Sequence, residues 1–457
     1  MKREVAAFWQ GKRVLVLGLA KSGLAAARLL RRLGAEVTVN EQKPEAQCPE
    51  ALALRQEAIP AVFGGHPEEL LLRQWDAVVK NPGIPYHAVP VKRLQERGIP
   101  IYTEVEIAGS LTEARLIGIT GSNGKTTTTS LVAAILSTGG KAKAVGNIGT
   151  ALSEVAADAA ADETLVVELS SFQLMGTKEF HPHIGVMLNL FPAHLDYHGS
   201  MAEYTAAKAR LFANQGADDV AVLNADSPPC RQIAADLRSQ IWWFSLERAV
   251  ERGVYLSGEH FYHVWPGREP IAFFPLRELK LKGRHNWENA LAASAASLAA
   301  GASVEQIRQV LKEFAGVPHR LEFVAEVGGV SYFNDSKATN PDAALRALTS
   351  FDCPITWIAG GLDREITFAP LLDAIRQRVR RVIVMGETAQ RIAQLCEQAG
   401  IRERFFVENV EEAVAVAHRI TLPGESVLLS PACASWDQYR SYEERGDMFK
   451  AAVHRLV

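Results

Sequence analysis

The chain has 457 residues, more than a single hydrophobic core usually organises, which predicts about three domains. Its 48% hydrophobic and 22% charged residues are ordinary for a globular protein, and a net charge of -3 excludes the basic excess that reading a nucleic-acid backbone requires. Five scattered cysteines without CxxC spacing indicate neither a disulfide framework nor a zinc site.

The N-terminal segment has no features of an export or membrane signal. Residues 1–13 lack an apolar stretch with a small-residue cleavage site, and no apolar run approaches the ~20 residues that span a bilayer. The scattered cysteines fit a reducing compartment. We therefore expect a cytoplasmic protein, a monomer, with no nucleic-acid or membrane partner.

The first hundred residues alternate between strand and helix patterns. Residues 13–19 predict an apolar strand, residues 22–34 an amphipathic helix and residues 35–41 a second strand. The same alternation continues through strand-like residues 75–81, helix-like residues 87–98 and strand-like residues 99–104. This predicts a Rossmann-like domain with a parallel sheet over residues 1–102.

A glycine-containing turn, GLAKSG at residues 18–23, follows the first of these strands. It resembles a dinucleotide fingerprint, but Ala20 occupies the place of the second glycine, and Glu41 ends the next strand where an acidic residue often meets a ribose. A purely structural turn fits this pattern as well as an NAD site does. A nucleotide-sugar diphosphate would satisfy the same geometry.

A second alternating series predicts a central domain over residues 103–316. Strand patterns at residues 115–120, 164–169, 183–190 and 219–226, with helices between them, predict a mostly parallel sheet. Short aromatic-rich strands from about residue 240 to 282 predict a small antiparallel extension of that sheet. The alanine-rich residues 288–301 predict a packed helix that closes the domain.

The sequence GITGSNGKTTTT, residues 118–129, lies between a predicted strand and a predicted helix and indicates a phosphate-binding loop. Glycines let backbone N–H groups surround phosphate oxygens, Lys125 can reach the terminal phosphates, and the Thr126 hydroxyl can hold Mg²⁺. The loop is shorter than the full GxxxxGK[ST] pattern, because Ile119 stands at the first glycine position. The predicted ATP-binding loop consists of Gly121, Ser122, Asn123, Gly124, Lys125, Thr126 and Thr127.

Acidic and histidine residues follow two of the central strands. Glu168 lies at the end of a strand, where a phosphate-loop enzyme needs a carboxylate for its metal ion. His194, Asp196 and His198 lie within five residues after another strand. That cluster fits either a metal site or a polar turn.

Gly316 and Pro318 interrupt the pattern, and a third alternating series predicts a second Rossmann-like domain over residues 317–457. Its predicted strands include residues 354–361, 381–387 and 426–431. Asp335, Lys337 and Thr339 follow the strand-like residues 330–334, and Ser435 is placed at a helix start where free N–H groups favour a carboxylate. Either segment could be a plain turn or cap, but both in one domain favour an anionic amino-acid substrate.

Together these motifs resemble the Mur ligase family over nearly the whole chain. The order and spacing of the motifs are specific, although each alone would be weak. In chain order they are GLAKSG at 18–23, GITGSNGKTT at 118–127, GNIG at 146–149, ELSSFQL at 168–174, HLDYHGS at 194–200 with Lys208 downstream, GRHNWENALAA at 283–293, GVPHRLE at 316–322, NDSKATNP at 334–341 and SPACASWDQYRSYEERGDMF at 430–449.

The resemblance implies an α/β protein of three domains: a Rossmann-like domain for a UDP-sugar, a central P-loop ATPase domain, and a Rossmann-like domain that brings an amino acid. It implies a ligase of cytoplasmic peptidoglycan precursor synthesis that adds D-glutamate to UDP-N-acetylmuramoyl-L-alanine. ATP would convert the substrate carboxylate to an acyl phosphate, which the amine attacks. Another Mur-type ligase, a folylpolyglutamate synthetase, an NAD-dependent oxidoreductase and a non-enzymatic nucleotide-binding module are the alternatives.

The resemblance also implies catalytic and metal-binding roles. Lys125 and Thr126 would hold the phosphates and a first Mg²⁺, and Glu168 would complete the ligands of that ion. His194 and a carbamylated Lys208 would hold a second Mg²⁺, which makes Lys125, His194 and Lys208 the implied catalytic residues. From the residues alone, an unmodified surface lysine is the default interpretation of Lys208.

The remaining implied contacts are with the nucleotide and the two other substrates. They are Asn286 and Asn289 on the adenine side, Arg320 and Asp335 at the γ-phosphate and ribose, Asn147 and His319 at the substrate carboxylate or sugar, Ser22, Glu41, Asn81 and Gly83 at the UDP moiety, and Lys337, Thr339, Ser435 and Tyr442 at D-glutamate. Arg364 is a possible further basic partner of the amino acid.

Overall fold

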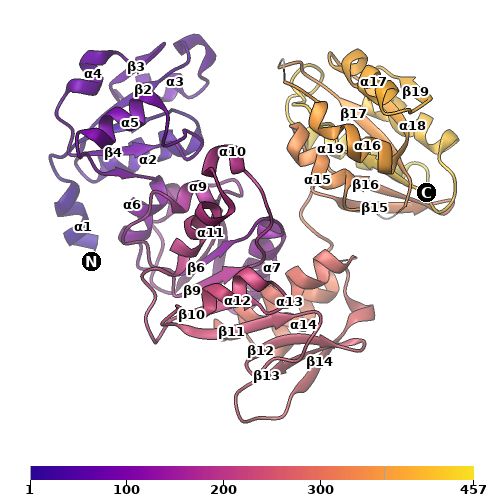
Figure 1. The fold of residues 1–457 in the computed structure, drawn as a ribbon, viewed down its shortest axis with the longest axis horizontal. Helices are drawn as coiled ribbons and strands as arrows, with labels where there is room; N and C mark the ends of the chain where they lie inside the picture. Colours follow the sequence, from indigo (N-terminus) through magenta and orange to yellow (C-terminus); the bar gives the residue numbers. More distant parts are fainter. Residues whose placement is uncertain (1, 282, 352, 365) are drawn as a thin grey trace. The chain divides into compact units, whose positions relative to one another are not determined.

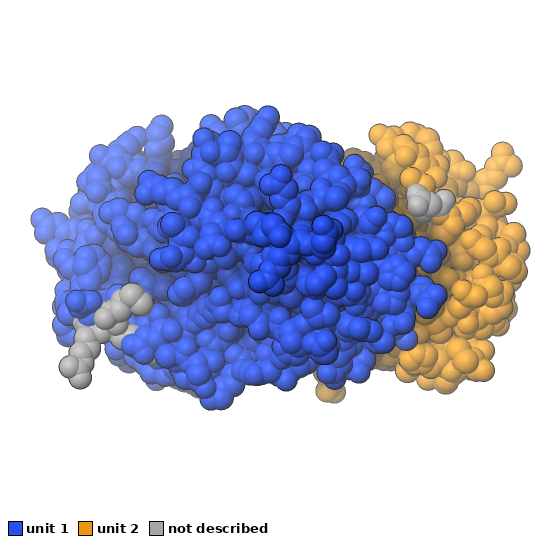
Figure 2. All heavy atoms as spheres, turned by 90° about the horizontal axis from the view of Figure 1, so that it is seen from below, with its two compact units in different colours: residues 1–314 blue, residues 315–457 orange. Residues whose placement is uncertain are grey.

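The computed structural model describes residues 2–281, 283–351, 353–364 and 366–457 (Figure 1). The chain divides into two compact units, residues 1–314 and residues 315–457, which Figure 2 distinguishes by colour. The first unit contains a five-stranded and a nine-stranded sheet, and the second contains a six-stranded sheet. The side chain of Asp196, from the predicted histidine cluster, lies outside the described part.

The N-terminal part of the first unit is a parallel sheet, as predicted, and its five strands have the order β3-β2-β1-β4-β5, in which β3 was not among the predicted strands. Its strands are β1 (Arg13–Leu17), β2 (Glu36–Glu41), β3 (Ala61–Phe63), β4 (Ala77–Lys80) and β5 (Ile101–Tyr102). Its helices are α1 (Lys2–Trp9), α2 (Lys21–Arg32), α3 (Ala51–Gln56), α4 (Glu68–Leu72), α5 (Val89–Glu96) and α6 (Glu104–Leu111), with a 3-10 turn η1 (Glu45–Gln47).

The central strand β1 explains why this sheet is covered on both faces. Val14 and Val16 belong to one core cluster and Leu15 and Leu17 to another, because successive side chains of a strand point to opposite faces. The strand order reverses between β1 and β4, and ligands bind outside the carboxyl ends of strands at such a point. The turns after β1 and β4 therefore lie at the ligand-binding edge.

The central sheet has the order β14-β13-β12-β11-β10-β9-β6-β8-β7. Its strands are β6 (Arg115–Thr120), β7 (Lys141–Gly146), β8 (Glu163–Glu168), β9 (Ile184–Met187), β10 (Val220–Asn224), β11 (Gln240–Ser245), β12 (Gly253–Ser257), β13 (His260–Val264) and β14 (Ile271–Pro275). Its helices are α7 (Lys125–Ser137), α8 (Leu152–Val155), α9 (Ser171–Leu174), α10 (Leu195–His198), α11 (Met201–Ala209), α12 (Pro228–Ala234), α13 (Arg284–Ala299) and α14 (Val304–Glu313), with 3-10 turns η2 (Arg210–Phe212) and η3 (Leu276–Glu278).

The antiparallel part of this sheet is smaller than predicted. The pair β10–β11 and the pair β11–β12 are both parallel, and only β12–β13 and β13–β14 are antiparallel. Alternation in the sequence reports which side chains are buried but not the direction of the neighbouring strand. The extension therefore begins at the β12–β13 pair rather than at residue 240.

Helix α13 packs against α7, the helix that follows the phosphate loop. Its buried face is made of small side chains such as Ala292, Ala293 and Ala296, which are 0% exposed. Small residues let two helices approach closely. This packing brings the first turn of α13 to the amino end of α7.

The second unit has the strand order β15-β16-β20-β17-β18-β19, in which only the edge pair β15–β16 is antiparallel. Its strands are β15 (Glu322–Val327), β16 (Val330–Asn334), β17 (Ile355–Gly360), β18 (Val379–Met385), β19 (Glu403–Phe406) and β20 (Ser426–Leu429). Its helices are α15 (Pro341–Leu348), α16 (Leu372–Arg378), α17 (Ala389–Gln398), α18 (Val410–Ile420) and α19 (Tyr442–His454), with a 3-10 turn η4 (Ala369–Leu371).

The predicted helix start at Ser435 is wrong. Helix α19 begins at Tyr442, because the Ser441 side chain accepts a hydrogen bond from Glu444 N and caps the helix. Ser435 instead begins a turn in which its carbonyl oxygen accepts hydrogen bonds from Gln438 N and Tyr439 N at 3.1 and 2.8 Å. Residues that can cap occur at both positions, so the sequence alone did not distinguish them.

Two further observations concern membrane-spanning helices and the cysteines. Within the described residues, no helix is long and apolar enough to cross a membrane. All five cysteines carry free thiols, and four of them are buried.

A buried carboxyl group makes the stability of the first unit depend on pH. Glu104, at the start of α6, is 2% exposed, and burial raises its pKa to about 7. Its Oε2 accepts a hydrogen bond from Ser153 N at 3.0 Å, whereas its Oε1 has no partner among the described residues. The folded pKa lies above the unfolded value of 4.5, so folding favours the protonated carboxyl group. The contribution of this group to the unfolding free energy is therefore fully present below pH 4.5 and is lost as pH rises from there through 7.

We therefore predict that Glu104→Gln removes this titration. Between pH 4 and pH 8 the unfolding free energy of the wild type should fall relative to that of the variant by up to roughly 3 kcal/mol. Urea unfolding at several pH values measures it. The exposed control Glu96→Gln should show no such trend, and equal pH profiles for Glu104→Gln and wild type would refute the assignment.

Candidate active site

The phosphate loop joins β6 to α7, as predicted, and two of its glycines are sterically required. Gly121 and Gly124 have φ values of 156° and 81°. A Cβ atom on Gly121 would lie 2.9 Å from the Cβ of Leu188, and one on Gly124 would lie 2.1 Å from Oδ1 of Asn289. The loop is therefore packed between β9 and α13, with its backbone at the amino end of a 13-residue helix.

The loop is held by the segment that follows β9. Ser122 N and Asn123 N donate hydrogen bonds of 2.9 Å to the carbonyl and side-chain oxygens of Asn189, respectively. Ser122 Oγ accepts a hydrogen bond of 2.9 Å from Phe191 N and lies 3.0 Å from the Tyr204 hydroxyl. Sequence reasoning missed Asn189, although an asparagine two residues after a buried strand was a usable signal.

Two lysines meet at the carbonyl oxygen of Gly121. Lys125 Nζ and Lys208 Nζ each donate a hydrogen bond of 2.9 Å to this oxygen, and Lys208 Nζ also donates one of 3.2 Å to Thr120 Oγ1. Lys208 is only 2% exposed, so its interpretation as a surface lysine is wrong. Burial, reinforced by Lys125 and opposed by Glu168, holds the pKa of Lys208 well below its ordinary value.

Glu168 supplies a buried carboxylate next to this pair. It is 2% exposed and ends β8, and its Oε1 accepts a hydrogen bond of 3.0 Å from Asn147 Nδ2. Its Oε2 is buried and has no hydrogen-bond partner among the described residues. A buried carboxylate oxygen without a partner is unfavourable, and a hard cation such as Mg²⁺ would satisfy it. Thr126, 1% exposed in the first turn of α7, adds a hydroxyl of the kind that such an ion takes.

The predicted histidine cluster is divided. His194 is exposed, has φ of 54° and precedes α10, with its ring 5.0 Å from that of Phe172. His198 is 2% exposed, stacks on Phe172 at 5.3 Å, and its Nε2 lies 2.9 Å from Ser171 Oγ. Within the described side chains, no three His, Cys, Asp or Glu residues form a group that could hold a metal ion.

Two asparagines of α13 lie beside the loop. Asn289 is 4% exposed, and its Nδ2 donates a hydrogen bond of 3.3 Å to Asn286 Oδ1. Thr128 Oγ1 donates one of 3.4 Å to Asn289 Oδ1. The structure thus brings the predicted Asn286 and Asn289 next to Gly124.

The residues predicted for the UDP moiety lie at the carboxyl edge of the first sheet. Asn81 Nδ2 donates a hydrogen bond of 3.1 Å to Ser22 Oγ, and Asn81 Oδ1 accepts one of 3.0 Å from Gly83 N. Glu41 accepts hydrogen bonds from Leu19 N at 2.7 Å and Lys43 N at 3.0 Å. The turns after β1, β2 and β4 thus form one braced surface.

In the second unit, Asp335 is held deep in the fold. It is 5% exposed, and its Oδ2 and Oδ1 accept hydrogen bonds from Ser430 Oγ at 2.8 Å and Leu321 N at 3.2 Å. Burial raises its pKa to about 7, against smaller lowering by these two hydrogen bonds and by the charge of Arg320. Arg320 itself is exposed.

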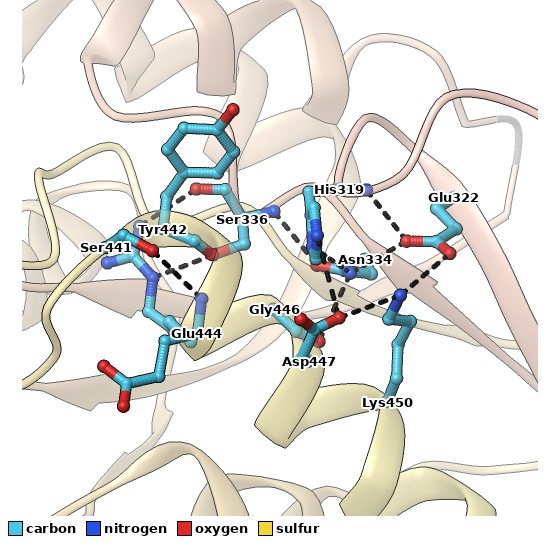
Figure 3. A network of polar contacts seen from close by, with 11 residues as sticks. His319, Glu322, Asn334, Ser336, Ser441, Tyr442, Glu444, Gly446, Asp447 and Lys450 are labelled. Carbon is cyan, nitrogen blue, oxygen red and sulfur yellow. Dashed lines mark hydrogen bonds and ion pairs between the residues drawn. The ribbon is translucent and has the colours of Figure 1, made fainter.

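The predicted residues His319, Lys337 and Tyr442 form one cluster, and Figure 3 shows the contacts around His319 and Tyr442. The rings of His319 and Tyr442 meet edge to face at 6.0 Å, and Lys337 Nζ lies 5.8 Å from the Tyr442 ring centre. His319 Nδ1 lies 3.1 Å from Asn334 Nδ2, and burial lowers the pKa of His319. Thr339 follows closely, with its N–H donating to Lys337 O at 2.9 Å.

Arg364 and Ser435 lie on two loops that are hydrogen-bonded to each other. Leu362 N donates a hydrogen bond of 3.0 Å to Ala434 O. The Arg364 guanidinium lies 4.7 Å from the ring centre of Trp436, which is 64% exposed, whereas Ser435 is 2% exposed. The structure therefore offers the Arg364 side chain to a ligand more readily than the Ser435 hydroxyl.

Sequence reasoning missed Arg445, which organises this region. It is 0% exposed, and it donates hydrogen bonds of 3.0 Å to both Ser336 Oγ and Ser336 O and one of 3.2 Å to Cys433 O. It shares the buried face of α19 with Phe449 and Val453, at helical spacing. An arginine on an otherwise apolar helix face was a signal for a buried polar role.

We predict that Gly124→Ala weakens adenine-nucleotide binding at least about tenfold, the equivalent of about 1.4 kcal/mol. The added methyl group would meet Asn289 Oδ1 and would have to adopt a positive φ. Gly301→Ala is the matched control, because Gly301 has φ of +97° with no atom within 4 Å. Calorimetric titration with ADP measures the difference, and equal affinities for the two variants would contradict the prediction.

Three protein-family comparisons cover most of the chain. The MurD-like N-terminal domain of Mur ligases matches residues 12–103, the Mur ligase middle domain matches residues 119–297, and the Mur ligase glutamate ligase domain matches residues 319–433. Each match coincides with one of the three sheets described above.

Similar full-length proteins and solved structures extend these matches. The chain is 51% identical to a protein of Geobacillus kaustophilus and 46% identical to one of Bacillus subtilis, both named UDP-N-acetylmuramoylalanine–D-glutamate ligase, over 98% of this chain and 99% of each relative.

The solved structures show the same fold at low identity. MurF from Acinetobacter baumannii aligns with a TM-score of 0.56 at 16% identity, covering 99% of this chain and 98% of its own. UDP-N-acetylmuramate-alanine ligase MurC from Thermotoga maritima aligns with a TM-score of 0.54 at 20% identity, covering 97% and 99%. The chain therefore belongs to the Mur ligase family of ATP-dependent enzymes that form amide bonds.

Proposed function

We propose that this protein joins D-glutamate to the L-alanyl carboxylate of UDP-N-acetylmuramoyl-L-alanine, with conversion of ATP to ADP and phosphate, in the cytoplasmic synthesis of peptidoglycan precursors. The near full-length identity of 51% to a relative named for this reaction carries the choice of substrates. The phosphate loop with its two lysines and the buried Glu168 supports the chemistry. We also propose that the protein acts as a monomer.

The proposed domains follow the three sheets. Residues 1–102 would bind the UDP-sugar, residues 103–316 would bind ATP, and residues 317–457 would bind the amino acid. The family matches at residues 12–103, 119–297 and 319–433 support this division.

The chemistry must overcome the low reactivity of a carboxylate anion. Transfer of the γ-phosphoryl group to a carboxylate oxygen turns that oxygen into part of a phosphate leaving group. The D-glutamate amine then attacks the carbonyl carbon, a C–N bond forms, the C–O bond to phosphate breaks and the amine loses a proton. Lys125 would neutralise the charge of the transferred group and orient it.

The other nucleotide contacts are proposed from residues beside the loop and in the second unit. Gly121 to Thr127 would hold the phosphates through backbone N–H groups. Asn286 and Asn289 would face the adenine side, Arg320 the γ-phosphate and Asp335 the ribose.

Mg²⁺ would be held by Thr126 and Glu168, and a second ion by His194 and a carbamylated Lys208. When bound, Mg²⁺ neutralises phosphate charge during the transfer. The unpartnered Oε2 of Glu168 supports the first position. The second position depends on the conversion of Lys208 from an amine to an anion.

The state of Lys208 favours that conversion. Only a neutral amine attacks CO₂, forming an N–C bond and releasing a proton to leave a carbamate anion. Burial and the neighbouring Lys125 hold the Lys208 pKa well below its ordinary value, which raises the share of neutral amine. A carbamate would also relieve the meeting of two amines at one carbonyl oxygen.

The remaining predicted residues would position the two other substrates. Asn147 and His319 would face the carboxylate or sugar of the UDP-linked substrate. The UDP moiety would contact Ser22, Glu41, Asn81 and Gly83, and D-glutamate would contact Lys337, Thr339, Ser435, Tyr442 and Arg364.

We predict that phosphate release with ATP, Mg²⁺ and UDP-N-acetylmuramoyl-L-alanine depends on D-glutamate. Its kcat/KM should exceed that of L-glutamate, D-aspartate and L-lysine by at least about tenfold. A site shaped for both carboxylates of D-glutamate leaves polar groups unpaired when the chirality is reversed, the chain is one carbon shorter or the second carboxylate is missing. Omission of the UDP-linked substrate is the control. Higher turnover with another amino acid would indicate a Mur ligase of different specificity.

We predict that ¹³C-labelled bicarbonate gives a carbamate signal in the carbon NMR spectrum of the protein and that Lys208→Ala abolishes it. Removal of CO₂ should lower turnover, and added bicarbonate should restore it. The control is Lys92→Ala, at an exposed lysine of α5, which should keep both the signal and the bicarbonate response. Full activity in the absence of CO₂ together with no signal would exclude the carbamate.

A further inference from the structure

A lysine lies buried at the carboxyl end of the first sheet without a carboxylate partner among the described residues. Lys80, the last residue of β4, is 1% exposed. Its Nζ donates hydrogen bonds to the carbonyl oxygens of Asn81, Pro82 and Ile84 at 3.3, 3.2 and 2.8 Å. Burial lowers its pKa to about 7, and both protonation states keep N–H groups for these carbonyls.

The carbonyls that Lys80 binds belong to the turn proposed for the UDP moiety. This turn is fixed from the other side as well, because Asn81 N donates a hydrogen bond of 2.7 Å to Leu17 O and Asn81 Nδ2 reaches Ser22. A Cβ atom on Gly18 would lie 2.8 Å from the Asn81 Cβ atom, so the turns after β1 and β4 touch. Lys80 therefore organises the turn from within the sheet.

Lys80 also reaches the central domain. Its Nζ donates a hydrogen bond of 3.2 Å to the Tyr197 hydroxyl, and this hydroxyl lies 3.1 Å from Pro82 O and 3.0 Å from Ile84 O. Since one hydroxyl has one hydrogen, Tyr197 accepts from Lys80 and donates to one carbonyl of the turn. Tyr197 belongs to α10, which directly follows His194.

From Tyr197 the contacts continue to the proposed catalytic groups. The Phe172 ring lies 4.3 Å from that of Tyr197 and 5.0 Å from that of His194. The His198 ring lies 5.2 Å from Tyr197 and 5.2 Å from Tyr204, whose hydroxyl contacts Ser122 of the phosphate loop. One continuous set of contacts thus joins the turn at residues 81–84 to His194 and to the phosphate loop.

We propose that Lys80 and Tyr197 are positioning residues that fix the turn at residues 81–84 relative to the His194 segment and the phosphate loop. A substrate held at its UDP end by this turn would then present its distant carboxylate at a defined place for phosphoryl transfer. Misplacement of the reacting carboxylate by about 1 Å can lower the rate by roughly a hundredfold, so the rate depends on a rigid contact between the turn and the catalytic segment. This inference rests on the proposed function.

The chain contains a matched control for this link. Tyr86 also contacts Lys80, with its ring centre 4.6 Å from Nζ, but its buried hydroxyl has no hydrogen-bond partner among the described residues. Tyr86→Phe therefore removes a hydroxyl beside the same lysine without removing a hydrogen bond of the link. Tyr197→Phe removes the hydroxyl that joins the two domains and keeps the ring against Phe172.

The test compares steady-state kinetics and thermal unfolding of wild type, Tyr86→Phe, Tyr197→Phe and Lys80→Met. We expect Tyr197→Phe to lower kcat by roughly tenfold with the KM for ATP within about twofold of wild type, because a misplaced carboxylate affects the transfer and not nucleotide binding. Lys80→Met should in addition raise the KM for the UDP-linked substrate. The two effects should be less than multiplicative in the double variant, since both residues act through one link.

Equal kcat for Tyr197→Phe and Tyr86→Phe would overturn the inference, whether or not Lys80→Met folds. If Tyr197→Phe lowered the thermal unfolding temperature but left kcat and KM unchanged, the contact would have a structural role only, and the inference would be wrong. If wild type released no phosphate with D-glutamate, the proposed function would fail. The role of Lys80 in fixing the turn would then be tested by calorimetric titration with UDP. Lys80→Met should bind UDP more weakly than Tyr86→Phe, and equal affinities would contradict that role.

Discussion

The active-site region depends on one backbone carbonyl oxygen at the base of the phosphate loop. Gly121 O accepts hydrogen bonds from both Lys125 and Lys208, at 2.9 Å each. Two amines at one acceptor repel each other when both are charged, and burial makes the charged form of Lys208 still less favourable. A lysine, which usually lies on the surface, is thus buried against the loop with its pKa held well below the ordinary value. The positive φ values of Gly121 and Gly124 and the packing of Asn289 against Gly124 hold the loop in the conformation in which both lysines reach Gly121 O.

A second constraint is the direction of the strands. In each sheet the parallel strands end at one edge, and the candidate residues collect there: Ser22 and Asn81 in the first, Glu168 and the phosphate loop in the second, and Asp335 with Ser430 in the third. Because parallel strands place their carboxyl ends together, residues far apart in the chain become neighbours without any local sequence signal. Polar side chains that face inward at these edges are then held by backbone groups, as Glu41 and Asp335 are.

The strands were predictable where their burial is complete. β1, β6 and β17 are apolar runs covered on both faces, and glycine or polar residues end them, so the periodicity and the turn chemistry agree. Prediction failed where competing residues offered the same local signal. Ser435 and Ser441 could both cap a helix, and only the position of α19 selected Ser441. The direction of β11 relative to its neighbours could not be predicted from the sequence either, because burial alternates in the same way beside a parallel or an antiparallel strand.

The sequence by itself determined the three α/β series, the phosphate loop between a strand and a helix, and the set of polar residues at strand ends. These follow from local spacing, because hydrophobic period, glycine turns and loop chemistry act over a few residues. The tertiary structure alone decided that Lys208 is buried against Gly121, that Arg445 ties two loops together, and that Lys80 meets Tyr197 across 117 residues of chain. Burial and the pKa of a side chain depend on what packs around it, and that packing is made by segments distant in sequence.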